Sequence, residues 1–227
     1  MPNPLQSAIG STLALIFDMD GVIIQSNPLH SEAWTAFNRR YGVETTDAML
    51  LDMFGKRNDD IIRSFFGEGL SPEEIAARGA AKEQLFREMA VGRVEEMLTP
   101  GLRRFLDRHR ASPMALASNA EPENIGFILG EAALGRYFQA VLDGHLVKRP
   151  KPYPDLYLLA AERLNARPGD CIVFEDSYSG VEAARGAGMR VVGIRSTHSE
   201  LPGCDFEVDD FLSEDLEAWL ITQMRTV

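Results

Sequence analysis

The chain has 227 residues, of which 45% are hydrophobic and 25% charged, the usual proportions of a soluble globular protein. This length accommodates one large domain or a core that carries a smaller second domain. The formal net charge of −11 at pH 7 argues against nucleic-acid or anionic-membrane binding, because both need basic surfaces.

The N-terminal segment has no basic region, and the apolar run after it soon meets Asp18. We therefore expect neither a signal peptide nor a membrane span. The two cysteines, Cys171 and Cys204, form no disulfide framework, and Cys171 opens the apolar run CIVF, which is typical of a small buried thiol. A reducing cytoplasm fits this cysteine usage.

Five short apolar runs have the character of buried strands, and they are residues 13–17, 114–117, 140–142, 171–174 and 190–194. From the second run onward, helix-like segments separate them, at 121–132, 154–164 and 179–187. Apolar strands that alternate with helices predict a doubly wound α/β fold, with a parallel sheet covered on both faces. Sites in such folds lie beyond the carboxyl ends of the strands.

The long segment between the first two apolar runs favours helix. Asn27-Pro28 predicts a helix start with Asn27 as the cap, and helical runs follow at 58–66 and 71–97. The second of these runs opens with the capping pattern S-P-E-E. We therefore predict a helical cap at 26–97, inserted into an α/β core of residues 1–25 and 98–227. A lid over the site is its expected use.

Two acids, Asp18 and Asp20, follow the first apolar run and flank Met19. Residues two apart on an extended backbone point the same way, so both carboxylates leave the strand end on one side. Gly21 then permits a sharp turn. Close carboxylates repel unless a cation lies between them or one binds a proton. The alternative is that the two aspartates only cap a helix or form a turn. Their position directly after the apolar run LALIF disfavours this alternative.

A second acidic pair, Glu175-Asp176, ends the run 171–174. Two parallel strands that deliver carboxylates to one edge make an all-oxygen site, and such ligands suit Mg²⁺ rather than zinc. Capping of the next helix is the alternative for this pair.

Two further segments contribute polar groups to the predicted edge. Ser118-Asn119 offers a hydroxyl and backbone donors at the start of a helix, which suits an anion, although both residues are also good helix caps. The segment VKRPKPYP holds Lys151 between two prolines, with Lys148 and Arg149 nearby. Spacing alone does not choose among these three cations.

Four motifs thus occur in order, namely DMDGV at 18–22, SN at 118–119, K-P-x-P-D at 151–155 and FEDS at 174–177. In this combination the chain resembles the haloacid dehalogenase superfamily, in the branch whose helical cap lies between the first two motifs. That branch contains β-phosphoglucomutase-like proteins and phosphatases. The resemblance covers nearly the whole chain, and its motif frame selects Lys151 among the three cations.

The resemblance implies phosphoryl transfer with two different roles for the first aspartates. Asp18 would be the nucleophile that attacks phosphorus, and Asp20 would protonate the leaving oxygen and then activate water. Ser118 and Lys151 would hold the transferring phosphoryl oxygens. Dehalogenating members lack the second aspartate, so Asp20 disfavours carbon–halogen cleavage.

The resemblance also implies a Mg²⁺ ion. It places the metal between the Asp18 side chain, the Asp20 backbone carbonyl and Asp176. Glu175 would be adjacent, either coordinating the metal directly or supporting the residues that coordinate it.

Two residues of the predicted cap match family positions that contact substrate. His30 stands where mutases of the family carry a histidine for acid–base work on a sugar hydroxyl, as many of its phosphatases also do, and packing beside Trp34 is its alternative. Lys82 matches a lysine that reaches the distal phosphate or carboxylate of a substrate, and a solvated helix lysine is its alternative.

The segment FGKRNDD at 54–60 resembles the family's substrate-specificity loop, with Gly55 at its turn. The mutase pattern has an arginine three residues after that glycine, where this chain has Asn58. Arg57 lies one place earlier, which re-aims its side chain and disfavours phosphoglucomutase activity. Lys56, Arg57 and Lys82 together would make the lid basic and suited to a small anionic substrate.

These observations favour a Mg²⁺-dependent phosphatase that acts on a small phosphorylated metabolite, a sugar or sugar-acid phosphate, through an aspartyl-phosphate. One alternative is a β-phosphoglucomutase-like hexose-phosphate mutase. Another is a non-catalytic metabolite-binding protein. We expect no nucleic-acid or membrane partner, and a monomer or weak dimer.

Overall fold

The computed structural model describes residues 13–53 and 56–224. Its centre is a six-stranded parallel sheet in the order β3-β2-β1-β4-β5-β6. The strands are β1 (Ala14–Phe17), β2 (Met114–Ser118), β3 (Ala140–Asp143), β4 (Cys171–Glu175), β5 (Arg190–Ile194) and β6 (Phe206–Val208). The predicted doubly wound α/β fold is confirmed, and β1 lies centrally, at the point where the strand order reverses.

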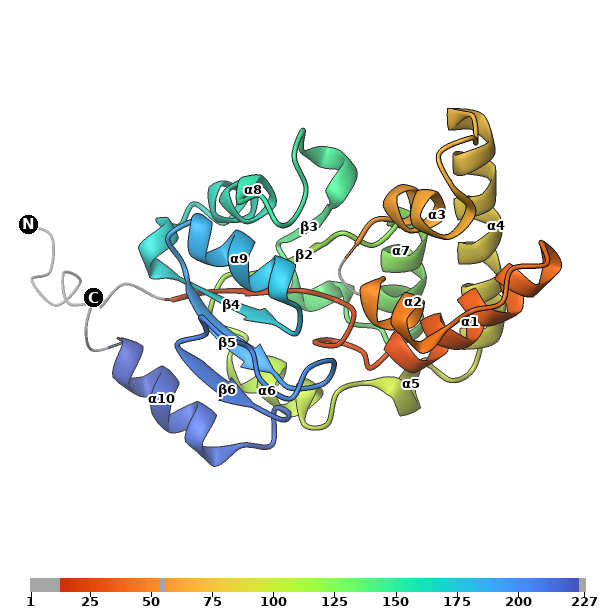
Figure 1. The fold of residues 1–227 in the computed structure, drawn as a ribbon. Coiled ribbons are helices and arrows are strands. Elements are labelled where there is room, and N and C mark those ends of the chain that lie inside the picture. The colour runs from red at the N-terminus through yellow and green to blue at the C-terminus, as the bar shows by residue number, and fades with distance from the viewer. Residues whose placement is uncertain (1–12, 54–55, 225–227) are drawn as a thin grey trace, which may run out of the picture.

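Helices cover both faces of the sheet, as Figure 1 shows. One face carries α6 (Leu102–Arg108), α7 (Pro122–Glu131) and α10 (Glu214–Met224), and the other carries α8 (Asp155–Arg163) and α9 (Tyr178–Gly186). Successive residues of β1 serve opposite faces, because side chains alternate along a strand. Phe17 packs against Phe105 on the first face, whereas Ile16 belongs to the cluster of Leu156 on the second.

The remaining elements of the described residues are the cap helices and short 3₁₀ turns. The cap helices are α1 (Asn27–Arg40), α2 (Asp47–Asp52), α3 (Asn58–Phe66), α4 (Pro72–Ala90) and α5 (Val94–Met97). The turns are η2 (Gly135–Tyr137), η3 (Gly144–Leu146) and η4 (Pro168–Asp170). The cap helices lie together beyond one end of the sheet (Figure 1). Trp34, Phe37 and Ile62 belong to a hydrophobic cluster of the cap's own. The boundaries 26–97 remain a prediction.

The structure corrects two local predictions in the cap. The helix predicted at 71–97 ends at Ala90, and α5 begins at Val94, because Gly92 has a positive φ of 72°. Asn27 does not cap α1, since Ser26 is at the cap position, and the Ser26 side chain makes no capping hydrogen bond. The S-P-E-E pattern does form a capping box between Ser71 and Glu74.

The chain leaves β1 for the cap and returns from it at one place. Ile24 forms an antiparallel bridge with Leu98. Gln25 N donates to Met97 O at 2.8 Å, and Thr99 N donates to Ile23 O at 3.1 Å. The outgoing and returning segments are therefore hydrogen-bonded to each other beside the carboxyl end of β1.

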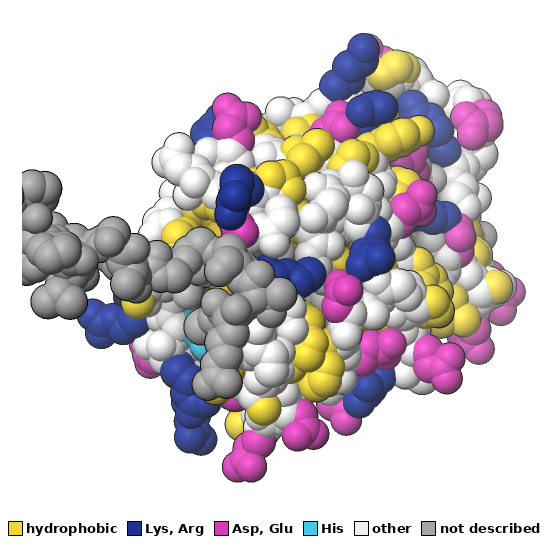
Figure 2. All heavy atoms as spheres, turned by 90° about the vertical axis from the view of Figure 1, so that its left-hand side faces the viewer, with side chains coloured by type: hydrophobic (Ala, Val, Ile, Leu, Met, Phe, Trp, Pro, Cys, Tyr) yellow, Lys and Arg dark blue, Asp and Glu magenta, His cyan; other side chains and the backbone are white. Residues whose placement is uncertain are grey.

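The surface remote from the cap has a mixed character. Figure 2 shows basic side chains lying among acidic ones on this face, with apolar side chains between them. Within the described part of the chain, no helix combines the length and the apolar character that crossing a bilayer requires.

Candidate active site

Three neighbouring strands deliver polar side chains to one edge of the sheet. Asp18 follows β1, Ser118 ends β2, and Glu175-Asp176 closes β4. These strands are adjacent in the order β2-β1-β4, so their carboxyl ends meet. Asp18, Ser118 and Asp176 line a cavity that the cap residues His30 and Lys82 also line. The predicted site therefore lies between the core and the cap.

Lys151 is the cation that the loop before α8 places in this cavity. Its Nζ lies 2.7 Å from Asp18 Oδ1 and 2.6 Å from Glu175 Oε1. Burial alone would lower the pKa of Lys151, but the two facing carboxylates raise it. Arg149 instead pairs with Asp155 at 2.8 Å. Of these two cations, Lys151 is therefore the one that faces Asp18 and Glu175, and its catalytic role stays a prediction.

Glu175 is fully buried, and both of its oxygens are occupied. Oε1 accepts from Lys151 and from the Tyr157 hydroxyl at 2.6 Å. Oε2 accepts from the backbone N–H groups of Asp176 and Ser177 at 2.9 and 3.1 Å. Burial would raise the pKa of Glu175, but Lys151 and these donors lower it. Tyr157 was not foreseen as a site residue, because its place in the apolar face of α8 is that of a core residue.

Gly180, in the first turn of α9, leaves space for the Glu175 carboxylate. A Cβ at this position would lie 1.8 Å from Glu175 Oε1. We expect Gly180→Ala to displace a buried, paired carboxylate and to lower the free energy of unfolding by at least about 3 kcal/mol. Urea denaturation measures this loss. The control is Gly186→Ala in the same helix, whose Cβ would meet Pro154 at 3.6 Å, an ordinary contact. Equal stability of the two variants would contradict the role of Gly180.

Asp176 is held by residues from two loops and from the first turn of α1. Asn27 Nδ2 lies 3.2 Å from Asp176 Oδ2, and the Thr197 hydroxyl donates to the same oxygen. Gly21, with φ of 79°, lies so close that a Cβ would stand 1.8 Å from that oxygen. Burial and the charges of Glu175 and Asp18 raise the pKa of Asp176 well above its usual range. Asn27 was missed as a site residue because its position suggested a helix cap.

Among the described residues, the buried carboxylates of this site outnumber the cations beside them. Oxygens of Asp18, Glu175 and Asp176 lie within 4.8 Å of one another, and Lys151 is the cation between the first two. Burial raises the pKa of Asp18 to about 7, with Glu175 and Asp20 adding to the effect and Lys151 opposing it. A divalent cation would remove this imbalance. Since Glu175 is fully engaged, the Asp18 and Asp176 side chains fit best as hard oxygen ligands for Mg²⁺.

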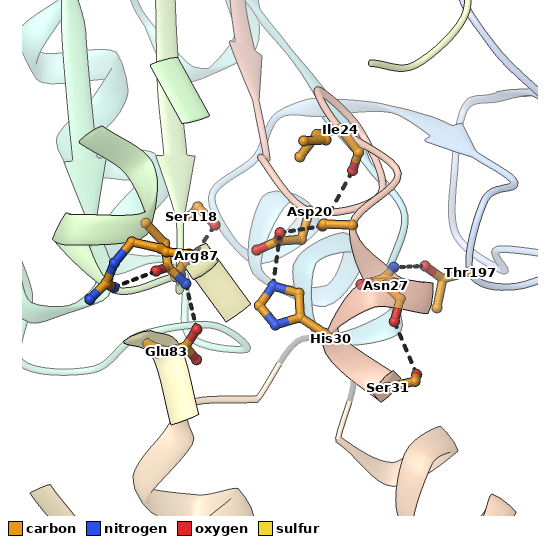
Figure 3. A network of polar contacts seen from close by, with 12 residues as sticks. Asp20, Ile24, Asn27, His30, Ser31, Glu83, Arg87, Ser118 and Thr197 are labelled. Atoms are coloured by element: carbon orange, nitrogen blue, oxygen red, sulfur yellow. Dashed lines mark hydrogen bonds and ion pairs between the residues drawn. The ribbon is translucent and has the colours of Figure 1, made fainter. Parts of the chain in front are cut away.

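Asp20 points into the cavity, where Ser26 and His30 hold it. The Ser26 hydroxyl donates to Asp20 Oδ1, and His30 Nε2 lies 3.4 Å from the same oxygen (Figure 3). Lys82 Nζ lies 2.8 Å from His30 Nδ1. Because an ammonium group can only donate, Nδ1 accepts, and the ring proton is on Nε2 facing Asp20. Burial would raise the pKa of Asp20, but the contacts with His30 and Ser26 lower it.

Lys82 is buried, so the alternative of a solvated helix lysine is wrong. Its Nζ bonds Glu83 at 2.7 Å and lies 4.9 Å from the centre of the Trp34 ring. Glu83 in turn accepts from Asn124 of the core helix α7 at 2.5 Å. Burial would raise the pKa of Glu83, but chiefly the charge of Lys82 lowers it to about 2. His30 also stacks on Phe86 at 3.8 Å between ring centres, so it both packs and contacts the site.

Ser118 and Asn119 line the cavity without capping α7. The cap position of that helix is Glu121, and no side-chain capping bond forms there. The Ser118 hydroxyl accepts from Ala120 N at 3.2 Å, and Asn119 Nδ2 donates to the Lys151 carbonyl at 3.3 Å. Asn119 therefore ties the loop of Lys151 to the end of β2.

The residues of the predicted specificity loop separate into two groups. Lys56 and Asn58 line the active-site cavity, whereas Arg57 lines only a second, neighbouring cavity, which Asn58 also borders. Lys56 pairs with Asp52 at 2.6 Å, and Asn58 Nδ2 donates to Glu121 Oε1 at 3.4 Å. The structure thus does not bring Arg57 to the site. The predictions for Gly55 and for the N-terminal segment concern residues outside the described part of the chain.

Comparison with known proteins matches residues 12–188 to the haloacid dehalogenase-like hydrolases. The chain is 33% identical to the fructose-1-phosphate phosphatase of Escherichia coli, over 80% of this chain and 95% of that protein. It is 34% identical to a phosphorylated carbohydrates phosphatase of Thermotoga maritima, over 80% and 84%.

Among solved structures, the β-phosphoglucomutase of Clostridium difficile superposes with a TM-score of 0.83 and 22% identity, covering 95% of this chain and 98% of that one. This likeness concerns the fold. The family match covers more than half of the chain and includes the cap and the four motifs. The chain therefore belongs to the haloacid dehalogenase-like hydrolases, and the predictions of this family and of an enzyme are confirmed.

Proposed function

We propose that this enzyme is a Mg²⁺-dependent phosphatase that hydrolyses a small sugar phosphate through an aspartyl-phosphate on Asp18. The observation that carries the proposal is the buried pairing of Asp18 with Lys151 at 2.7 Å, with Asp20 facing the same cavity. The names of the two relatives, both phosphatases of phosphorylated sugars or carbohydrates, support this substrate class. An intact pair of aspartates has no use in a protein that only binds a metabolite.

In the first step, an Asp18 carboxylate oxygen attacks phosphorus while Lys151 and the Ser118 hydroxyl hold the phosphoryl oxygens. Lys151 bonds one Asp18 oxygen and thereby orients the other toward the cavity. The side chains of Asp18 and Asp176 and the Asp20 carbonyl would hold Mg²⁺, which offsets negative charge on the phosphoryl group. Glu175 fixes Lys151 in place through their 2.6 Å bond.

Asp20 acts twice in this mechanism. The nearby negative charge of a phosphate ester raises its proton affinity, so it can carry the proton that the leaving oxygen takes. After the alcohol departs, the contacts with Ser26 and His30 favour the carboxylate, which removes a proton from the attacking water. His30, whose ring orientation Lys82 fixes, is the positioning residue for Asp20.

The mutase alternative differs in the fate of the aspartyl-phosphate, which would pass to a second hydroxyl instead of water. His30 leaves the mutase alternative open without favouring it, because many phosphatases of the family also carry a histidine there. Asn58 disfavours it, because the mutase pattern has an arginine at that position.

The test is a turnover screen over sugar phosphates with Mg²⁺ that measures free phosphate and isomerised sugar phosphate separately. If the enzyme is a phosphatase, one free phosphate is released for each sugar phosphate that is consumed. Isomerised product with little free phosphate would establish the mutase. No turnover of any ester, an aryl phosphate included, would favour a non-catalytic binder.

We expect Mg²⁺ to stabilise the protein more at pH 8 than at pH 6. The pKa of Asp18 rises from 3.8 to about 7 in the metal-free fold, so the stability that its proton contributes is lost as pH rises through 7. Mg²⁺ needs the ionised carboxylate and must displace that proton at lower pH. Thermal unfolding with EDTA or Mg²⁺ at both pH values measures the gain in Tm, and equal gains would contradict Asp18 as a ligand.

The cytoplasmic location and the monomeric or weakly dimeric state remain predictions. The free thiols Cys171 and Cys204 fit the first of these.

A further inference from the structure

Glu121 is a charged residue of the active-site cavity that has no role in the mechanism above. It lies between β2 and α7 and borders two cavities, the active-site cavity and the second cavity, which has a volume of about 460 Å³. Both cavities also share Asn58 and Glu83. A substrate body that extends from the phosphate toward the second cavity must therefore pass the Glu121 carboxylate.

The contacts of Glu121 keep one of its oxygens available to a substrate. Oε2 accepts from His145 Nε2 at 3.0 Å, and Arg57 donates to His145 Nδ1 at 3.3 Å, which fixes the ring proton on the side of Glu121. Oε1 accepts only a long bond of 3.4 Å from Asn58 Nδ2 among the contacts of the described residues. A bond of this length is weak, so a substrate hydroxyl can replace it.

The lysines that line the active-site cavity are already paired with carboxylates. Within the described residues, these pairs are Lys56 with Asp52 at 2.6 Å, Lys82 with Glu83 at 2.7 Å, and Lys151 with Asp18 at 2.7 Å. Lys151 serves the transferring phosphate, and the other two have no surplus charge for a second anion. A further phosphate or carboxylate on the substrate would meet Glu121 instead.

Arg57 does not supply the missing charge. Its guanidinium lies 3.4 Å from the Asp59 carboxylate and contacts His145, and it lines the second cavity rather than the active-site cavity. A second anion would reach it only by displacing these partners and passing Glu121.

We propose that Glu121 selects phosphate monoesters with an uncharged, polyhydroxylated body and rejects substrates that carry a second anion. A carboxylate accepts hydrogen bonds from hydroxyl groups, and it repels a phosphate or carboxylate placed beside it. This inference rests on the proposed phosphatase function and narrows it from sugar and sugar-acid phosphates to sugar monophosphates.

Two substrate pairs test the selection, because the members of each pair differ by one anionic group. Fructose 1-phosphate is compared with fructose 1,6-bisphosphate, and glucitol 6-phosphate with 6-phosphogluconate. We expect kcat/KM of the wild-type enzyme to be lower by about tenfold or more for the member with the second anion, in each pair that is hydrolysed. Equal or higher kcat/KM for that member would overturn the proposal and leave the phosphatase function intact.

Variants of Glu121 assign the selection to this residue. Glu121→Gln keeps the shape of the side chain and removes its charge, so the ratio of kcat/KM between the two members of each pair should approach one. Glu121→Lys should reverse the preference, so that the member with the second anion is hydrolysed with the higher kcat/KM. Glu131→Gln, the same change at an exposed position of α7, is the control and should keep the wild-type ratio. Circular dichroism checks the fold of each variant.

The outcomes separate the two proposals. An unchanged ratio in both folded Glu121 variants overturns the selection by Glu121. Hydrolysis of p-nitrophenyl phosphate without hydrolysis of any of the four sugar esters also overturns it, whereas the phosphatase chemistry stands. Failure with the aryl phosphate and all sugar esters overturns the proposed function, and the selection with it.

Discussion

Asp18→Asn is expected to reduce kcat by at least about 10⁴-fold toward every phosphate ester that the enzyme hydrolyses. An amide at this position keeps the size of the side chain and its contact with Lys151, but it cannot form the acyl-phosphate bond. Free-phosphate release measures the loss.

The fold should survive this substitution. Asp18 is one of three mutually close, buried carboxylates, and its neutralisation relieves repulsion while Glu175 still pairs with Lys151. We therefore expect a Tm close to that of the wild type in EDTA. Asp215→Asn, at an exposed position of α10, is the control for the same chemical change. A folded Asp18→Asn protein with substantial activity would exclude Asp18 as the nucleophile.

Lys151→Met is expected to destabilise the protein by about 3–5 kcal/mol at pH 8 and to abolish turnover. Methionine fills a similar volume but leaves the Asp18 and Glu175 carboxylates buried without their counter-charge. The difference in the free energy of unfolding between the variant and the wild type should shrink as pH falls. The loss of Lys151 raises the pKa values of Asp18 and Glu175, and protonated carboxyl groups need no cation beside them.

Urea unfolding at pH 8 and pH 5.5 measures this dependence. The control is Lys148→Met, three residues earlier and exposed, which should change neither stability nor its pH dependence. A pH-independent deficit in Lys151→Met would indicate lost packing rather than unpaired charge.

Much of the core was predictable because its strands are continuous apolar runs with carboxylates at their ends. The five predicted runs all form strands, and the acids after 13–17 and 171–174 meet as expected. β6 was missed because Phe206–Val208 is short and carries a glutamate. α6 and α10 were also missed, because neither segment carries a motif or a strong capping pattern.

The supporting residues of the site could not be predicted for a different reason. Tyr157 and Thr197 are remote in sequence from the carboxylates they bond, and neither has a local pattern that indicates this contact. Similarly, Arg57 and Asn58 are neighbours on the chain, yet only Asn58 reaches the active-site cavity. Which of two adjacent side chains faces a cavity depends on the helix start at Asn58, which lies within the uncertainty of sequence-based boundaries.

The bridge between Ile24 and Leu98 has a consequence for how this enzyme can diversify. Because the two ends of this insertion are neighbours, a change in its length alters the loop-closure cost only slowly, by about 0.6 kcal/mol for each doubling of length. The core can therefore accept a longer, shorter or differently folded segment between these residues without moving the strand that carries Asp18. Substrate choice can evolve in the inserted helices while the chemistry of the sheet edge stays the same.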